Sequence, residues 1–118
     1  MNDWERCSGF IEAALETCPT HNLEDVRTGI STGHFQFWPG QRCAVVTEVN
    51  DYPRIRLLHF WLMGGDLKEL LSMRPKIEAW AAVAGCKAVC GEGREAWGRV
   101  LLKHGYRRGP SEFMKELS

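Results

Sequence analysis

The stretch that decides the fold is Gly93-Arg94-Glu95-Ala96-Trp97-Gly98-Arg99-Val100-Leu101-Leu102-Lys103-His104-Gly105-Tyr106. Its apolar residues recur at helical spacing, so the pattern predicts an amphipathic helix with one buried face. Gly105 suits the left-handed residue that commonly follows a helix end. We therefore expect a helix that ends at this glycine and passes an aromatic residue, Tyr106, into an extended segment.

The segments before this helix alternate between helical and extended patterns. Helices are predicted over 4–18, 23–28, 67–74 and 75–84, and strands over 34–38, 42–49, 54–62 and 86–90. The last two helices are separated because Pro75 would cost about 3 kcal/mol inside a continuous helix. Residues 106–117 are expected to be extended or mixed.

Three local signals fix the ends of these helices. Asn22 with Asp25, and Asp66 with Glu69, have the spacing of capping boxes, and Gly85 should end the helix that starts at Pro75. The helical crossover from the third to the fourth strand makes that pair parallel and right-handed. The fold class is therefore α/β, a three-layer α/β/α arrangement with a mixed sheet.

Composition narrows the class of protein. The 118 residues suit one domain over 1–118, and 15 basic residues balance 15 acidic ones, which gives no reason to expect a nucleic-acid partner. The longest apolar run, 57–63, is too short to span a membrane, and the first residues lack a signal-peptide pattern. Five cysteines, an odd number, indicate reduced thiols and a cytoplasmic location.

Several short motifs resemble one known family. They are Trp38 with Ala44-Val45-Val46-Thr47, then Ile77-Glu78-Ala79-Trp80-Ala81, Gly85-Cys86 and Gly93-Arg94-Glu95-Ala96-Trp97. With the element order and the helix-glycine-aromatic ending, they are similar to the GNAT superfamily of N-acyltransferases, above all the small GNAT-like proteins of bacteriophages and prophages. The resemblance covers about residues 3–106 and lacks the family's initial strand, so it implies a reduced GNAT-like fold.

The resemblance also implies a cofactor site. In the family, acetyl-CoA lies between two splayed strands, and its pyrophosphate meets the N-terminus of the next helix, an anion-binding position. The matching loop is Met63-Gly64-Gly65-Asp66-Leu67-Lys68, with Gly64, Gly65 and Lys68 as cofactor-binding residues. Asp66 departs from the family pattern, because as a helix cap it would take the N–H groups that a phosphate needs. Gly64-Gly65 is therefore either a cofactor loop or a tight strand-to-helix turn.

The catalytic residues of the family have no clear counterparts. GNAT enzymes often place a proton-donating tyrosine four residues before the glycine of the last helix, and Leu101 stands there. Tyr106 matches a packing aromatic of the family. Glu48, His59 and Glu92 are the candidates for a general base, and each has a structural interpretation as well.

Two functions remain open. The first is a GNAT-fold protein of phage or prophage type, with a degenerate acetyl-CoA site and a role in binding a protein partner or as a virion component. The second is an acetyl-CoA-dependent N-acetyltransferase acting on an amine of a small molecule or protein. No metal is expected, because Cys86 and Cys90 in one strand would lie about 13 Å apart.

Overall fold

The computed structural model describes residues 2–91, 102–108 and 113–117. The chain divides into two compact units, one made of Met1–Glu48 and Trp61–Pro75, the other of Val49–Phe60 and Lys76–Ser118. Three elements run from one unit into the other: β2 (Cys43–Asp51), β3 (Arg56–Gly65) and α3 (Leu67–Val83). The fold class is α/β with a mixed sheet, as predicted.

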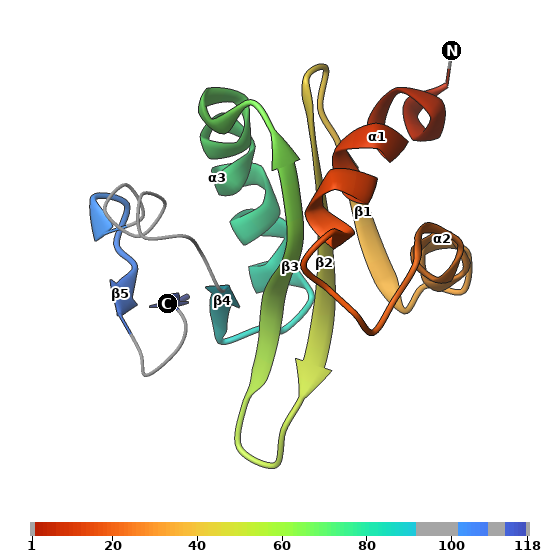
Figure 1. Ribbon diagram of the computed structural model, residues 1–118. Helices are drawn as coiled ribbons and strands as arrows, with labels where there is room; N and C mark the ends of the chain where they lie inside the picture. Colours follow the sequence, from red (N-terminus) through yellow and green to blue (C-terminus); the bar gives the residue numbers. More distant parts are fainter. Residues whose placement is uncertain (1, 92–101, 109–112, 118) are drawn as a thin grey trace. The chain divides into compact units, whose positions relative to one another are not determined.

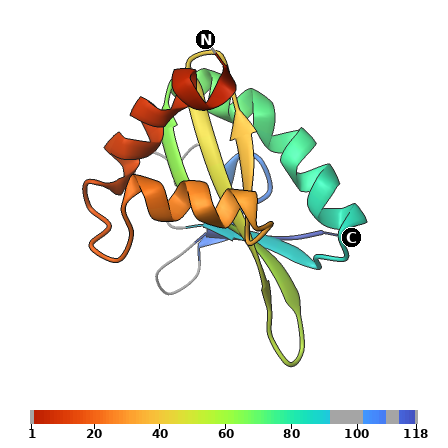
Figure 2. The ribbon, with the colours of Figure 1, turned by 90° about the vertical axis from the view of Figure 1, so that its right-hand side faces the viewer.

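The first unit is built from two helices and an antiparallel strand pair. It holds α1 (Asp3–Leu15), α2 (Leu23–Ser31) and β1 (Phe35–Pro39), with the first part of β2 and the end of β3. The strand order is β1-β2-β3, and β1 pairs with β2 from Phe35↔Glu48 to Pro39↔Ala44. Both helices lie on the same face of β1 and β2 (Figure 2). Their buried side chains form the core with the strands: Cys7, Ile11, Leu15, Val26, Phe35, Ala44, Val46 and Leu62.

The second unit contains the parallel pair. It holds β4 (Ala88–Gly91), β5 (Arg107–Arg108) and β6 (Phe113–Glu116) beside the start of β3, in the order β3-β4-β6-β5. β3 and β4 are parallel from Leu57↔Ala88 to Phe60↔Gly91, which confirms that this pair is parallel, as predicted. β6 is antiparallel to both of its neighbours. β3 continues for five residues beyond its last pair with β4 and ends at Gly65.

Local signals placed several helix ends correctly. The capping box of α2 forms, with Asn22 Oδ1 accepting from the Asp25 N–H and Asp25 Oδ2 accepting from the Asn22 N–H. α3 ends at Val83, after which Gly85 has φ +88 and the Cys86 N–H donates to the Ala81 carbonyl. That is the glycine termination expected for a helix followed by a strand. Gly105 also has positive φ, +89, and Tyr106 is buried, in line with their predicted roles.

The predicted helix break at Pro75 is wrong. α3 is one helix from Leu67 to Val83 with Pro75 inside it (Figure 1). Ile77 and Ala81 are buried beyond the proline and Leu70 before it. The free energy gained by burying these side chains favours a continuous helix. It offsets the cost of the backbone hydrogen bond that is lost because proline has no N–H.

The structure describes no residue between 91 and 102, so Glu92, Arg94, Trp97 and Leu101 lie outside the described residues. Among the residues that are described, no helix is long and apolar enough to cross a bilayer.

Candidate functional site

The predicted cofactor loop, residues 63–68, joins the end of β3 to the start of α3 and lies in the first unit. Both of its glycines have a packing reason. A Cβ on Gly64 would collide with the carbonyl oxygen of Phe10 in α1, and one on Gly65 would collide with the carbonyl of Arg42. Gly65 also has φ +106, where side chains are strained. The glycines therefore bring the loop against the protein's own backbone.

Asp66 occupies the N-terminus of α3. Its N–H donates to the Arg42 carbonyl at 2.9 Å, and its carbonyl accepts from the Leu70 N–H. Its Oδ1 accepts from the Lys68 N–H at 3.3 Å, while Oδ2 lies 3.8 Å from the exposed Arg42 guanidinium. Asp66 therefore caps the helix as predicted, and its carboxylate stands where the resemblance would place a phosphate.

Glu69 does not complete the predicted capping box. Its Oε1 accepts from the Arg42 N–H at 2.7 Å, so it reaches the loop between β1 and β2 instead of the Asp66 N–H. The Asp66 N–H is already bonded to the Arg42 carbonyl. Arg42 therefore uses its N–H, its carbonyl and its guanidinium to hold this loop to the start of α3.

A buried thiol lies under this contact. Cys43 is fully buried, and burial together with hydrogen bonding to Glu69 raises its pKa to about 12. The same hydrogen bond, with those from the backbone N–H groups of Arg42 and Gln41, lowers the pKa of the Glu69 carboxyl. A protonated thiol beside an ionised carboxylate is the state that these shifts favour.

Part of the α3 N-terminus remains open to an anion. The N–H groups of Leu67 and Glu69 have no acceptor in the part of the chain that the structure describes. The side chain of Lys68 is exposed. The turn can therefore offer two amides and one ammonium group, set against the carboxylates of Asp66 and Glu69.

Of the predicted general bases, only Glu48 is described in the same unit as this loop. Glu48 Oε2 lies 2.9 Å from His34 Nε2 at the end of the β1–β2 pair. His59 is half-buried in β3, opposite Cys90, and belongs to the other unit. Glu92 lies outside the described residues. No described contact joins Glu48 or His59 to Gly64, Gly65 or Lys68, so their catalytic roles remain predictions.

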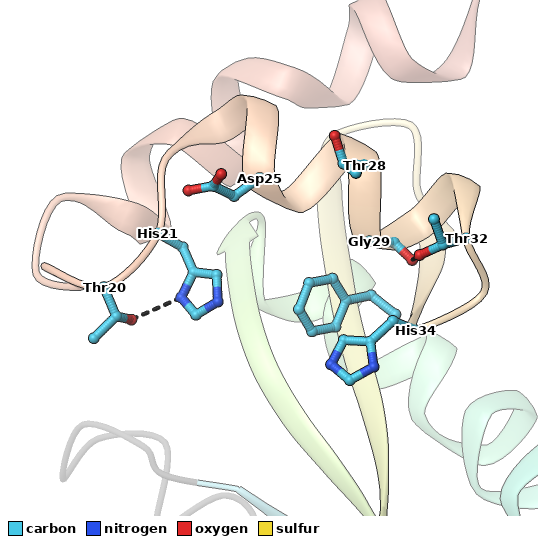
Figure 3. A pocket seen from close by; sticks show the side chains of 8 residues that line it. Thr20, His21, Asp25, Thr28, Gly29, Thr32 and His34 are labelled. Atoms are coloured by element: carbon cyan, nitrogen blue, oxygen red, sulfur yellow. Dashed lines mark hydrogen bonds between the residues drawn. The ribbon is translucent and has the colours of Figure 1, made fainter.

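A hollow beside α2 was missed by the sequence reasoning. It has a volume of about 500 Å³ and belongs to the first unit; we call it the α2 hollow (Figure 3). It is lined by Thr20, His21, Asp25, Thr28, Gly29, Thr32, His34 and Phe35. The polar members of α2 share one helix face, because they are spaced three or four residues apart. That spacing, together with His21 before α2 and His34 after it, was the sequence pattern that could have indicated the hollow.

A buried polar cluster lies in the second unit. Glu78 of α3 is buried; its Oε2 accepts from the Tyr106 hydroxyl at 3.0 Å and its Oε1 lies 2.8 Å from the Lys115 ammonium. Lys115 also donates to the His104 carbonyl at 2.9 Å. Tyr106 is therefore a core aromatic, as expected, whose hydroxyl has a structural partner.

Metal ligands do not gather among the described residues, where no group of three or more histidine, cysteine, aspartate or glutamate side chains could hold an ion. Cys86 lies before β4, not within it as predicted, and it and Cys90 are both buried.

Comparison with known proteins supports the fold. No known protein family and no curated protein matches the sequence. Among solved structures, the chain is similar to one from the crystal structure of the NatC complex bound to Gag peptide and CoA. The TM-score is 0.67 at 9% sequence identity, and the match covers 98% of this chain and 91% of the other. At this identity the likeness shows a GNAT-like fold.

Proposed function

We propose that this chain is a GNAT-fold binding protein, of the kind found in phages and prophages, in which the start of α3 no longer serves acetyl-CoA. The observation that carries the proposal is the Asp66 carboxylate, 3.3 Å from the Lys68 amide. A helix N-terminus attracts a phosphate because its amides are unpaired and its dipole end is positive. Here a carboxylate of the chain already uses that position.

The residues around Asp66 also disfavour the binding of a pyrophosphate. The Gly65 backbone is pressed against the Arg42 carbonyl, and the Glu69 carboxylate is held in the first turn by the Arg42 N–H. A pyrophosphate approaching this turn would meet two carboxylates at close range, and like charges in one site repel. A protein that binds a partner without transferring an acyl group needs none of these positions free.

The second half of α3 supports a protein partner. The exposed fraction of Trp80 is 38% and that of Val83 is 89%, and Ala79 and Ala82 are exposed beside them. Exposed apolar side chains three residues apart on a helix, such as those of Trp80 and Val83, are neighbours on its surface and can serve as a docking site for another protein. We propose a virion protein as that partner, which would place the chain in the host cytoplasm or in the virion.

The alternative function is an acetyl-CoA-dependent N-acetyltransferase that acts on an amine of a small molecule or a protein. Two observations favour it: the amides of Leu67 and Glu69 lack acceptors among the described residues, and the similar NatC chain comes from a complex bound to CoA. In this function Gly64, Gly65 and Lys68 would hold the pyrophosphate. Glu48, His59 or Glu92 would accept the proton of the attacking amine.

Calorimetric titration with acetyl-CoA separates the two functions. We expect no binding at millimolar cofactor for the unchanged chain. Asp66→Ser keeps a neutral helix cap and removes the charge, so it should gain weak binding. Micromolar binding by the unchanged chain would overturn the proposal, provided that Lys68→Ala weakens it and the control Lys76→Ala does not. Lys76 is exposed on the same helix but far from its N-terminus.

The phage assignment has its own test, because virion proteins are encoded together. Head or tail genes beside the gene for this chain would support it, and a metabolic operon would contradict it.

A further inference from the structure

We infer that the α2 hollow binds a small ligand that joins a primary ammonium group to a flat apolar portion. This site is separate from the turn at residues 63–68, so the inference does not depend on whether the chain binds acetyl-CoA. Its basis is the shape, the aromatic floor and the charge of the hollow.

The volume and the floor suit a small organic molecule. A volume of about 500 Å³ lies within the usual range for small-molecule sites. Phe35 forms the buried floor, with 7% of its surface exposed. A Cβ on Gly29 would collide with the Phe35 ring, so the glycine lets the ring pack directly against α2. The ring is therefore held in place before any ligand arrives.

Aromatic rings surround this floor. The Phe35 ring centre lies 4.7 Å from that of His34, 4.7 Å from that of Trp61 and 6.2 Å from that of His21. His21 is fixed by a 2.7 Å hydrogen bond between its Nδ1 and the Thr20 hydroxyl (Figure 3). The faces of such rings attract both flat apolar groups and cations.

The charge of the lining favours a cation. The lining residues include one carboxylate, Asp25, and no lysine or arginine. Asp25 Oδ2 accepts from the Asn22 N–H, and Oδ1 has no hydrogen bond among the described residues. A second carboxylate, that of Glu48, holds His34 at the other end of the hollow. An ammonium group can donate to Asp25 Oδ1 and to the threonine hydroxyls. An anion could accept only from hydroxyls and imidazoles, with no lysine or arginine in the lining, and the carboxylates would repel it.

The test uses benzylamine and benzyl alcohol, two probes of similar shape of which only the first carries a charge. Binding is followed by proton NMR of the four histidine rings, assigned by single His→Gln substitutions. His21 and His34 report on the hollow, while His59 and His104 lie outside it. We expect saturable shifts of His21 and His34 alone, with benzylamine binding about five-fold more tightly than the alcohol, the effect of one exposed ion pair.

A matched pair of variants isolates the charge. Asp25→Asn keeps an acceptor for the Asn22 N–H but removes the carboxylate, so benzylamine should fall to the affinity of the alcohol. Glu24→Gln removes an exposed charge from the same turn of α2, outside the hollow, and should leave the preference unchanged. The inference is overturned if neither probe gives saturable shifts, if all four histidines shift together, or if the two probes bind equally well. Tighter binding of benzoate than of benzylamine would also overturn it.

Discussion

At the scale of single residues, a substitution at Gly65 tests whether the loop at residues 63–68 packs directly against the backbone of Arg42. Its φ of +106 and the Arg42 carbonyl beside it leave no place for a side chain. We expect Gly65→Ala to lower the free energy of unfolding by about 2 kcal/mol or more, measured by urea denaturation. Gly9 in α1 has open space around it, so Gly9→Ala should raise the free energy by up to about 1 kcal/mol. Equal effects of the two changes would contradict the packing described for Gly65.

Cys43 links stability to alkaline pH. Its pKa in the folded protein is about 12, against an ordinary value of 9.0. Between these values the unfolded thiol has lost a proton that the folded thiol keeps, so the free energy of unfolding falls as pH rises from about 9 toward 12. One such group contributes at most about 1.4 kcal/mol per pH unit.

Cys43→Ala should therefore reduce this fall in the free energy of unfolding between pH 9 and 11. Cys18→Ala is the control, because hydrogen bonds, chiefly that with Thr20, lower the pKa of the Cys18 thiol. Unfolding curves at several pH values give the slopes. A Cys43→Ala slope equal to that of the unchanged chain would contradict the raised pKa.

At the scale of elements, the cluster around Glu78 joins α3, residues 104–106 and β6. Lys115→Met would remove an ammonium group that lies 2.8 Å from the buried Glu78 carboxylate, so we expect a loss of ~3 kcal/mol in the free energy of unfolding. The control is Arg107→Met, since both members of the Arg107–Glu116 pair are exposed and such pairs contribute less than about 1 kcal/mol. Similar losses for the two variants would show that Glu78 is not buried against Lys115.

Pro75 offers a stabilising change within α3. Pro75→Ala restores an N–H that can donate to the carbonyl four residues earlier and introduces the residue that favours helices most, so stability should rise by about 1–3 kcal/mol. Pro75→Gly restores the same N–H with a poor helix former and should give about 1 kcal/mol less. Thermal unfolding measures both. No gain from alanine would mean that α3 is broken at this position after all.

The elements also show where sequence reasoning succeeds. The Asn22–Asp25 box formed because both partners lie within one turn, and Gly85 and Gly105 adopt positive φ for equally local reasons. Glu69 has the spacing of a box partner but bonds to Arg42, which precedes it by 27 residues. Pro75 lies inside α3, because burial of apolar side chains on both sides of it outweighs the tendency of proline to break a helix. Partners that are distant in sequence therefore decided the cases in which local patterns failed.

The contrast between partners near in sequence and partners distant in sequence also explains which of the two sites could be predicted. The turn at residues 63–68 could be located from Gly64, Gly65 and Asp66, because the signal is contiguous. The α2 hollow combines a loop, one face of α2 and the start of β1 around the Phe35 ring, and no motif marks such a combination. The role of Arg42 in holding Asp66 and Glu69 follows from the β1–β2 connection meeting α3, which only the fold reveals.

At the scale of the whole molecule, a single domain over 1–118 remains a prediction. The chain forms two compact units, yet β2, β3 and α3 each belong to both. Unfolding either unit would cut two strands and one helix at internal positions and expose their backbone groups. Because short strands and half-helices are unstable alone, we propose that the two units unfold together.

Hydrogen exchange on two destabilised variants tests this proposal. Gly65→Ala acts in the first unit and Lys115→Met in the second. If the units unfold together, each variant should lower the exchange free energy of the slowest amides by the same amount at Val46 of β2 and at Val89 of β4, which are fully buried in different units. If each variant instead weakened protection only within its own unit, the chain would consist of two separately folding parts joined by continuous elements. Binding at the α2 hollow would then stabilise only the first unit, so an amine ligand that raised the protection of Val89 would itself show that the units are coupled.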